Sequence, residues 1–288
     1  DMQLQPKKFN DFKCGDKCSE LLRQITEKQT APEGDIAQYI SEPDCWLEYS
    51  FFEWIWKNRD NVFRIMLDTQ FRMHPDIANF VGHIFYSGHL KTEVSADERK
   101  LGFGEFNKPI CLISTSAYPN HHETMVGHGY SNPLEAQIIH QVIDRAEQEL
   151  DSSQSFGIIT PYTAQKQCVS KLLESSVGNL KYVDLTENDI KSVDGFQGEE
   201  RDVIIISFVR SPTPCSRCKS QTNNQRKNKR CSKCFGKGHS GSGLTFVRDL
   251  RRLNVAFSRA RKMLILVGDF DTLKDPQYHG GRRGSEVL

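Results

Sequence analysis

Two near-continuous apolar runs, Val203–Phe208 and Met263–Val267, constrain the fold of this chain more than any other feature. Runs without polar alternation are typical of parallel strands that helices cover on both faces. Each run follows a segment rich in charged and amide side chains, at 191–202 and 251–261, that has no place in a core. We therefore expect a parallel sheet with a surface at one of its edges that meets a polyanion.

The rest of the chain supplies the other elements of an α/β domain. Strands that alternate with helices favour a doubly wound sheet. The predicted helices are an aromatic-rich, buried one at Cys45–Lys57 and three more at Pro75–Phe85, Pro133–Leu150 and Tyr162–Glu174. Further strands are expected at Phe63–Leu67, Ile110–Ile113, Phe156–Thr160, Tyr182–Leu185 and Ile190–Val193. Residues 1–42 are mixed and polar, which indicates a linker or a peripheral piece.

Size and cysteine content narrow the class of protein. A chain of 288 residues forms one large domain or two small ones. It contains no apolar stretch near the ~18 residues of a membrane span and no visible signal peptide. The nine cysteines are odd in number, and two of them, Cys111 and Cys168, lie among apolar residues. This pattern favours a reducing compartment with some metal-bound thiols, and so an intracellular protein, cytoplasmic or nuclear.

The segment Gln70–Pro75 is the first candidate for ligand binding. It lies between a predicted strand and the start of a helix, the junction at which open α/β sheets bind ligands. Phe71 could stack on a base, and Arg72 could bind a phosphate with two parallel hydrogen bonds. The alternative is a capped turn with a solvated arginine.

A second candidate, Gly157–Gln165, carries Thr160 and Tyr162 between a strand and a helix. A free helix N-terminus offers unpaired N–H groups to a phosphate, although Thr160 could equally act as the N-cap. A third candidate, Ser192–Asp202, contains Gly198, which permits close backbone approach. Its carboxylate at Glu200 suits ribose hydroxyls or the waters of Mg²⁺.

The segment Arg251–Arg261 predicts a helix that leads into the last strand. Arg252 and Arg259 crowd this short element, and like charges destabilise a helix unless an anion compensates them. The alternative is a solvated basic helix whose apolar residues pack inward. The chain contains no Gly-x-x-x-x-Gly-Lys-Ser/Thr phosphate loop, so these candidates describe half of an ATP site.

Taken in order, these segments resemble the second motor domain of superfamily 1 helicases, in the branch related to the nonsense-mediated-decay RNA helicase. The matching stretches are LDTQFRMHPDI (67–77), GIITPY (157–162), SVDGFQGEERDV (192–203) and RRLNVAFSRAR (251–261), with LVGD (266–269) behind them. The resemblance implies a RecA-like P-loop NTPase fold, with a parallel sheet and helices on both faces, over residues 43–288. It also implies that two such domains close on ATP and Mg²⁺ and translocate along single-stranded RNA or DNA.

Family roles follow from the same resemblance. Phe71, where the family more often has tyrosine, would stack on adenine beside Gln70, and Arg72 and Arg259 would act as arginine fingers on the γ-phosphate. The remaining nucleotide contacts would come from Gly198 and Glu200. The residues that would face the nucleic acid strand are Thr160, Tyr162 and Ser192.

The first residues resemble the tail of the Gly-Asp-x-x-Gln-Leu-x-Pro motif that ends the first motor domain, with Gln3 as its γ-phosphate sensor. We therefore expect residues 1–42 to be the end of that domain and a linker, and the chain to be a fragment. The family's phosphate loop and Mg²⁺-binding Asp-Glu pair lie upstream of this motif, so the chain alone is expected to be inactive. The alternative is a complete but catalytically inactive RecA-like and zinc module that binds nucleic acid or protein.

Four cysteines, Cys215, Cys218, Cys231 and Cys234, have the spacing of a tetrahedral Cys₄ zinc site. A disulfide or redox pair is the alternative. They lie in a predicted insertion at 212–242, where the family usually has a short loop. Eight lysines and arginines and no acids lie between Cys215 and His239, so the remainder of the chain is acidic. We hypothesise that this basic insertion contacts the nucleic acid backbone or a partner; the alternative is a structural clip with a solvated surface.

Overall fold

The structure is a computed structural model that describes residues 65, 67–150, 153–175, 185, 187–213 and 249–274. From residue 67 onward they belong to one compact unit. No helix in these ranges is long and apolar enough to cross a membrane. Several predictions from the sequence lie outside the described residues: the helix at 45–57, the region 1–42 with Gln3, and the insertion from residue 214 onward with its four cysteines.

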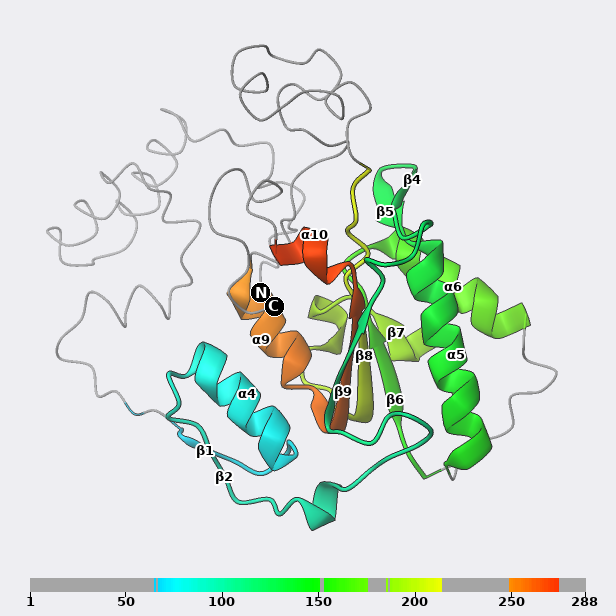
Figure 1. Ribbon diagram of the computed structural model, residues 1–288. Coiled ribbons are helices and arrows are strands. Elements are labelled where there is room, and N and C mark those ends of the chain that lie inside the picture. Colours follow the sequence, from blue (N-terminus) through cyan, green and yellow to red (C-terminus); the bar gives the residue numbers. More distant parts are fainter. Residues whose placement is uncertain are drawn as a thin grey trace, which may run out of the picture. The chain divides into compact units, whose positions relative to one another are not determined.

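A five-stranded parallel sheet forms the centre of the unit (Figure 1). The order of its strands is β3 (Ile110–Ser114), β9 (Ala260–Gly268), β8 (Arg201–Ser207), β6 (Phe156–Ile159) and β7 (Ile190–Lys191). Every neighbouring pair is parallel. The two apolar runs form the adjacent central strands β8 and β9, which confirms the predicted α/β fold with a parallel sheet.

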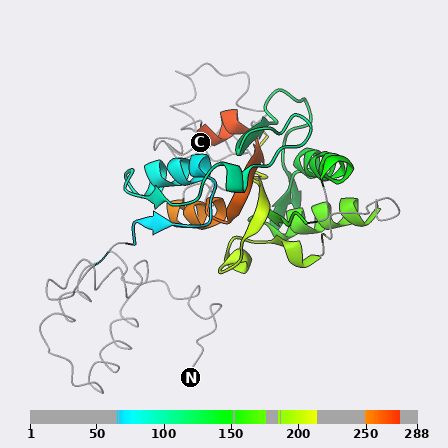
Figure 2. The same cartoon turned by 90° about the horizontal axis from the view of Figure 1, so that it is seen from below.

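Helices cover both faces of this sheet, as Figure 2 shows from below. Helices α4 (Pro75–Phe85) and α9 (Leu250–Phe257) lie on one face. Helices α5 (Pro133–Glu149) and α6 (Thr163–Ser175) lie on the other, and the short α10 (Phe270–Lys274) follows β9.

The two faces explain why the apolar runs have no polar alternation. Ile204 and Ile206 of β8 belong to the core cluster that contains Ile77 of α4. Val203 and Ile205 point to the opposite face and join the cluster of α5 and α6. These four residues of β8 are fully buried. Because successive side chains of a strand point to opposite faces, a strand covered on both sides needs an apolar residue at every position.

Short elements surround the sheet. Strand β1 (Thr69–Gln70) pairs with β2 (Lys91–Thr92) in a separate two-stranded parallel sheet. Strands β4 (Thr124–Val126) and β5 (Gly129–Ser131) form a hairpin. The 3₁₀ turns are η3 (Asp97–Arg99), η4 (Glu187–Asp189) and η5 (Asp194–Phe196). The segment Gln70–Pro75 therefore lies between β1 of this smaller sheet and α4.

Two predicted strands are described only in part, and the bounds of a third differ from the structure. Ile65 and Leu67 are not in a strand, and the other residues of the strand predicted at 63–67 lie outside the described ranges. Leu185, the one described residue of the strand predicted at 182–185, is not in a strand either. Strand β7 ends at Lys191, two residues early, because Val193 is buried and starts the η5 turn.

The predicted helix at 251–261 ends at Phe257, so Arg259 lies in a turn and Arg261 lies in strand β9. The cause is pairing with the neighbouring strand: the backbone N–H of Arg201 donates to the carbonyl of Arg259 at 3.1 Å. At its start the helix is capped by Asp249, whose carboxylate accepts from the N–H groups of Arg251 and Arg252. The arginines of this segment are therefore divided between a helix, a turn and a strand.

Candidate functional site

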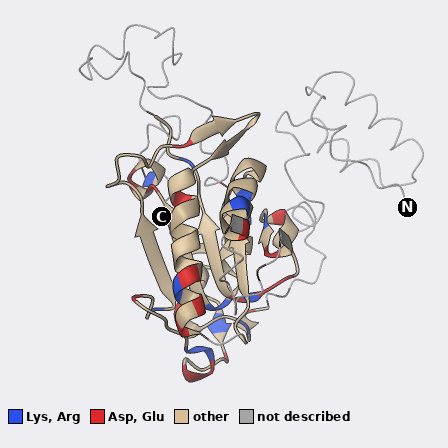
Figure 3. Cartoon of the chain, turned by 90° about the vertical axis from the view of Figure 1, so that its right-hand side faces the viewer, with Lys and Arg blue, Asp and Glu red and all other residues tan. Residues whose placement is uncertain are grey.

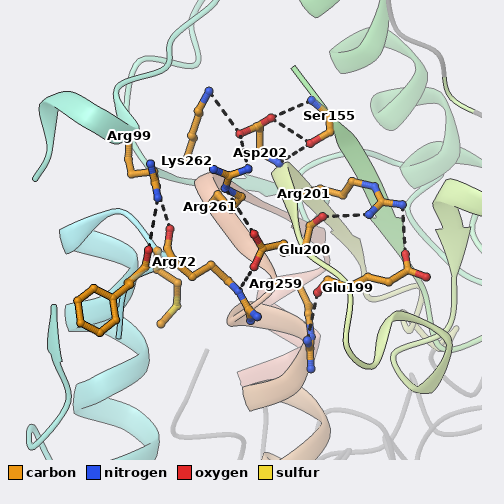
Figure 4. Close-up of polar contacts among 12 residues, drawn as sticks. Arg72, Arg99, Ser155, Glu199, Glu200, Arg201, Asp202, Arg259, Arg261 and Lys262 are labelled. Atoms are coloured by element: carbon orange, nitrogen blue, oxygen red, sulfur yellow. Dashed lines mark hydrogen bonds and ion pairs between the residues drawn. The ribbon is translucent and has the colours of Figure 1, made fainter. Parts of the chain in front are cut away.

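The amino ends of β8 and β9 bring together three segments that are far apart in sequence. Arg72 lies just before α4, Glu200 just before β8, and Arg259 just before β9. The Nε–H of Arg72 donates to the Glu200 carboxylate across 128 positions of sequence. A second nitrogen of Arg72 donates to the backbone carbonyl of Ser258 at 3.1 Å. Figure 4 shows this cluster, and Figure 3 shows blue and red segments gathered at the lower end of the sheet.

The charges at this edge continue in an alternating series. Glu200 lies 3.7 Å from Nε of Arg261, and Arg261 lies 4.0 Å from a carboxylate oxygen of Asp202. The ammonium group of Lys262 lies 3.3 Å from the same oxygen of Asp202. Burial raises the pKa of Asp202, but hydrogen bonds from Ser155 and the charge of Lys262 outweigh it and hold that pKa below its usual value. Asp202 is therefore an ionised anchor for the cations of β9.

Arg259 is positioned by backbone carbonyls. Its Nε–H donates to the carbonyl of Val255 at 3.2 Å, and a terminal nitrogen donates to the carbonyl of Glu199 at 3.1 Å. Burial lowers the pKa of Arg259, the nearby Arg72 guanidinium lowers it further, and Glu200 and Glu199 oppose both effects. Two guanidinium groups thus lie close enough to repel each other, an arrangement that a bound polyanion would stabilise.

The turn at Gln70–Met73 is held by the Gln70 side chain. Its amide oxygen accepts from the backbone N–H groups of Arg72 and Met73 at 2.8 and 2.7 Å. Its amide nitrogen donates to the carbonyl of Met73 at 3.1 Å and to the hydroxyl of Thr92. Since both the oxygen and the nitrogen of the Gln70 side-chain amide form hydrogen bonds to or near this turn, the residue shapes the turn.

Phe71 projects from that turn and is 68% exposed. It borders an open cavity of about 390 Å³. The other residues that line the cavity are Thr69, Gln70, Arg72, Met73, Arg99, Glu200 and Ser258. An exposed aromatic ring next to a cluster of guanidinium groups is suited to a ligand with a flat ring at one end and negative charge at the other.

Gly198 lies in the turn before Glu200 with a φ of +88°. A Cβ at this position would meet no atom within 4 Å. The glycine is therefore required by the left-handed backbone of the turn, and crowding among the described residues plays no part.

The residues predicted to face nucleic acid lie at the opposite, carboxyl edge of the sheet. Thr160 follows β6 and Ser192 follows β7, and the N–H of Thr160 donates to the carbonyl of Lys191 at 3.0 Å. The Ser192 side chain is exposed, whereas Thr160 is buried. Tyr162 is half-buried, and its hydroxyl accepts from Arg210 at 3.2 Å. The structure thus brings Thr160 and Ser192 together and exposes the side chain of Ser192.

Sequence reasoning missed Arg99 and Arg261. The Nε–H of Arg99 donates to the carbonyl of Arg72 at 3.0 Å, and a terminal nitrogen donates to the carbonyl of Phe71 at 3.4 Å. Arg99 lies in η3, 27 positions from Arg72, and its local sequence carries no signal of that contact. The sequence predicts a helix at Arg261, whereas in the structure Arg261 lies in β9, 3.7 Å from the Glu200 carboxylate.

Metal ligands are not grouped in the described part of the chain. No cluster of three or more His, Cys, Asp or Glu residues suited to a metal ion occurs there. Cys111 and Cys168 are free thiols, and burial raises the pKa of Cys111. The four cysteines predicted to bind zinc lie outside the described ranges.

Comparison with known proteins gives a family. Residues 47–271 match a family model described as "AAA domain". A putative regulator of nonsense transcripts 1 from Takifugu rubripes is 33% identical over 71% of this chain. The ATP-dependent helicase NAM7 of Saccharomyces cerevisiae is 28% identical over 71% of it, and the helicase sen1 of Schizosaccharomyces pombe is 28% identical over 84%. The matched region spans 16%, 18% and 13%, respectively, of these longer proteins.

Proposed function

The chain belongs to the AAA domain family, and from this premise we propose that it is the C-terminal motor domain of an ATP-dependent nucleic acid helicase. Curated relatives named as ATP-dependent helicases support a helicase domain. They also support the resemblance to superfamily 1 helicases that the motifs indicated.

One observation carries the proposal. The guanidinium groups of Arg72 and Arg259 converge with Glu200 at the amino edge of the sheet, beside the exposed ring of Phe71. This donor set fits a nucleoside triphosphate, because arginines bind phosphate oxygens in a planar fork and an aromatic face binds a base. In the proposed roles, Arg72 and Arg259 stabilise negative charge that develops on the γ-phosphate, and Phe71 stacks on the base. Glu200 lies next to the ribose and phosphates, with Gly198 shaping its turn.

The proposed site is one wall of a cleft. Among the described residues there is no phosphate loop and no metal-binding cluster. An upstream RecA-like domain would hold the phosphates and Mg²⁺, and the sensor residue Gln3 would belong to its end. Mg²⁺ supplies charge neutralisation between the phosphates when it is bound. Under this proposal the present chain alone does not hydrolyse ATP.

The carboxyl edge would bind the nucleic acid strand. Thr160 and Ser192 lie there side by side, and the Tyr162 hydroxyl accepts a hydrogen bond from Arg210. Residues 192–200 run from this edge to the amino edge, with Phe196 fully buried in the core between them. A segment that ends at Ser192 on one side and at Glu200 on the other offers a direct mechanical link between strand contact and nucleotide contact. The substrate class is single-stranded RNA or DNA, and the setting is intracellular.

The basic insertion at 212–242 completes the proposal. Its four cysteines, Cys215, Cys218, Cys231 and Cys234, would bind one Zn²⁺ as thiolates. Zinc would order a segment that has little apolar content of its own. The insertion begins just after β8, at the carboxyl edge.

The decisive test is ATP hydrolysis by the protein that carries this chain together with the upstream domain. We expect hydrolysis that single-stranded nucleic acid stimulates, and a loss of about 10³-fold or more in Arg259→Ala. Arg251→Ala is the matched control, because its side chain is 73% exposed on the neighbouring helix. Wild-type turnover in Arg259→Ala would disprove the arginine-finger assignment.

A further inference from the structure

We propose that Arg99 is a positioning residue for the nucleotide site, which holds the Phe71–Arg72 turn in its working geometry. The inference rests on the proposed function. It assigns a role to a residue that none of the motifs contains.

The first step is the contact itself. Arg99 donates from two nitrogens to two successive carbonyls, those of Arg72 at 3.0 Å and of Phe71 at 3.4 Å. No other hydrogen bond to either carbonyl occurs among the described residues. Figure 4 shows the Arg99 guanidinium aimed at the carbonyls of this turn. A forked, charged donor fixes two carbonyls at once, which a single-point donor cannot do.

The second step is that Arg99 itself is fixed. Ser95 and Glu98 form a reciprocal pair: the serine hydroxyl donates to the Glu98 carboxylate at 2.8 Å and accepts from its N–H at 3.3 Å. The N–H of Glu93 donates to the carbonyl of Gln70 at 3.2 Å, which attaches the same segment to the turn. Arg99 therefore transmits the position of an ordered segment to the turn.

The third step is that the turn needs such support. Phe71 is 68% exposed and so gains little orientation from packing. The side chain of Arg72 is bonded to the Glu200 carboxylate, and a nucleotide phosphate would compete with that carboxylate for the guanidinium. Hydrogen bonds from Gln70 within the turn and from Arg99 outside it fix the backbone. The backbone in turn sets the direction of the Phe71 and Arg72 side chains. Displacement of about 1 Å at such a site can reduce a rate about 100-fold.

Amide hydrogen exchange, measured without nucleotide, tests whether Arg99 stabilises the turn. In Arg99→Ala we expect the amides of residues 69–74 to exchange at least about tenfold faster, the equivalent of one charge-assisted hydrogen bond. Exchange in α5 and α6 should be unchanged. Arg145→Ala, which removes an arginine of similar kind paired with Glu149 on α5, should leave the turn unchanged. Unaltered exchange at 69–74 in Arg99→Ala would overturn the proposal.

ATP hydrolysis by the protein with its upstream domain supplies the second readout. Arg99→Ala should raise KM and lower kcat, each about tenfold, because base stacking and the arginine finger depend on one turn. Arg99→Lys should recover part of the loss. In an Arg72→Ala background the effect of Arg99→Ala on kcat should largely vanish, since a group that acts through Arg72 has nothing left to position.

The outcomes separate the two proposals. An equal loss in both backgrounds would show general destabilisation and would overturn the role of Arg99. Absence of ATP hydrolysis in the wild-type protein would overturn the proposed function, and hydrogen exchange alone would then decide whether Arg99 holds the turn.

Discussion

Arg72 donates its Nε–H to the carboxylate of Glu200, so the proposed arginine finger is bound to an anion of its own domain before a nucleotide arrives. Their side chains remain 35% and 43% exposed. Exposed ion pairs contribute about 0–1 kcal/mol to stability, so the value of this contact lies in where it places the two groups.

Glu200→Ala should therefore separate activity from stability. We expect a change of less than about 1 kcal/mol in the free energy of unfolding, measured by urea denaturation. The kcat for ATP should fall at least about tenfold, because Arg72 loses the carboxylate that orients it and Arg261 loses a carboxylate 3.7 Å away. Asp144→Ala is the control, since it removes a carboxylate that contacts His140 on α5 at 3.0 Å and does not line the cavity. Equal losses of activity in both variants would contradict the prediction.

Helix α4 and the two central strands follow from the sequence. Their residues are apolar at the required spacing, and local pattern decides them. The end of α9 does not follow, because strand pairing between Arg201 and Arg259 competes with helix continuation there. A contact between strands that are distant in sequence leaves no local trace.

In the candidate site, too, the sequence predicts the residues of the motifs but not the contacts between distant segments. Arg72, Glu200 and Arg259 were identified from motifs, and the structure brings them together. The edge of the sheet that carries them was not predicted, since the general rule for open α/β sheets places ligands at the carboxyl ends. The role of Arg99 could not be predicted from the sequence either, because it depends on the contact of η3 with a turn 27 residues earlier.

Gly198→Ala tests the conformation of the turn before Glu200. The residue has a φ of +88° and no neighbour within 4 Å of a Cβ, so the cost of alanine is purely conformational, about 1–2 kcal/mol. Gly88→Ala is a matched control, with a φ of +77° and equally open space after α4. Urea denaturation should show similar losses in both variants. ATP hydrolysis should fall only in Gly198→Ala, and a similar fall in Gly88→Ala would refute the link to Glu200.

Phe71→Ala tests the base-stacking surface. Removal of a ring that is 68% exposed should leave the unfolding free energy nearly unchanged. Stacking of an aromatic ring on a base is worth about 1–3 kcal/mol, so the KM for ATP should rise between about 5-fold and 150-fold. Phe71→Tyr should behave like wild type. Tyr118→Ala, which removes a ring that is 50% exposed elsewhere, should leave KM unchanged; an unchanged KM in Phe71→Ala would remove the stacking role.

Glu135 predicts a dependence of stability on pH. Burial raises its pKa to about 8, although hydrogen bonds from Ser207 and Val209 oppose the shift. Because the ordinary value is 4.5, the folded protein binds more protons than the unfolded chain between pH 4.5 and 8. The stability that this group contributes is fully present below pH 4.5 and is lost as the pH rises through 8.

Glu135→Gln isolates this effect. Glutamine keeps the volume and stays neutral, so the difference in unfolding free energy between variant and wild type should shift in favour of the variant as the pH rises from 5 to 8. Other titrating groups cancel in that difference, including His74, whose pKa burial lowers. Urea denaturation at four pH values measures it. Parallel curves for the two proteins would show that Glu135 does not titrate in this range.

The cysteine cluster predicts a bound metal. Metal analysis of the purified protein should find about one zinc per chain, since four thiolates complete a tetrahedral site. Replacement of Cys231 and Cys234 by serine should abolish zinc binding, because two thiolates cannot hold the ion against a chelator. Cys111→Ser and Cys168→Ser are the controls, as these two free thiols lie in the described part of the chain and outside the predicted insertion in sequence. A protein without zinc, with all its thiols reactive, would refute the Cys₄ site.

If zinc is present, deletion of 212–242 should reduce the salt dependence of single-strand binding, because the eight lysines and arginines between Cys215 and His239 would otherwise release counterions.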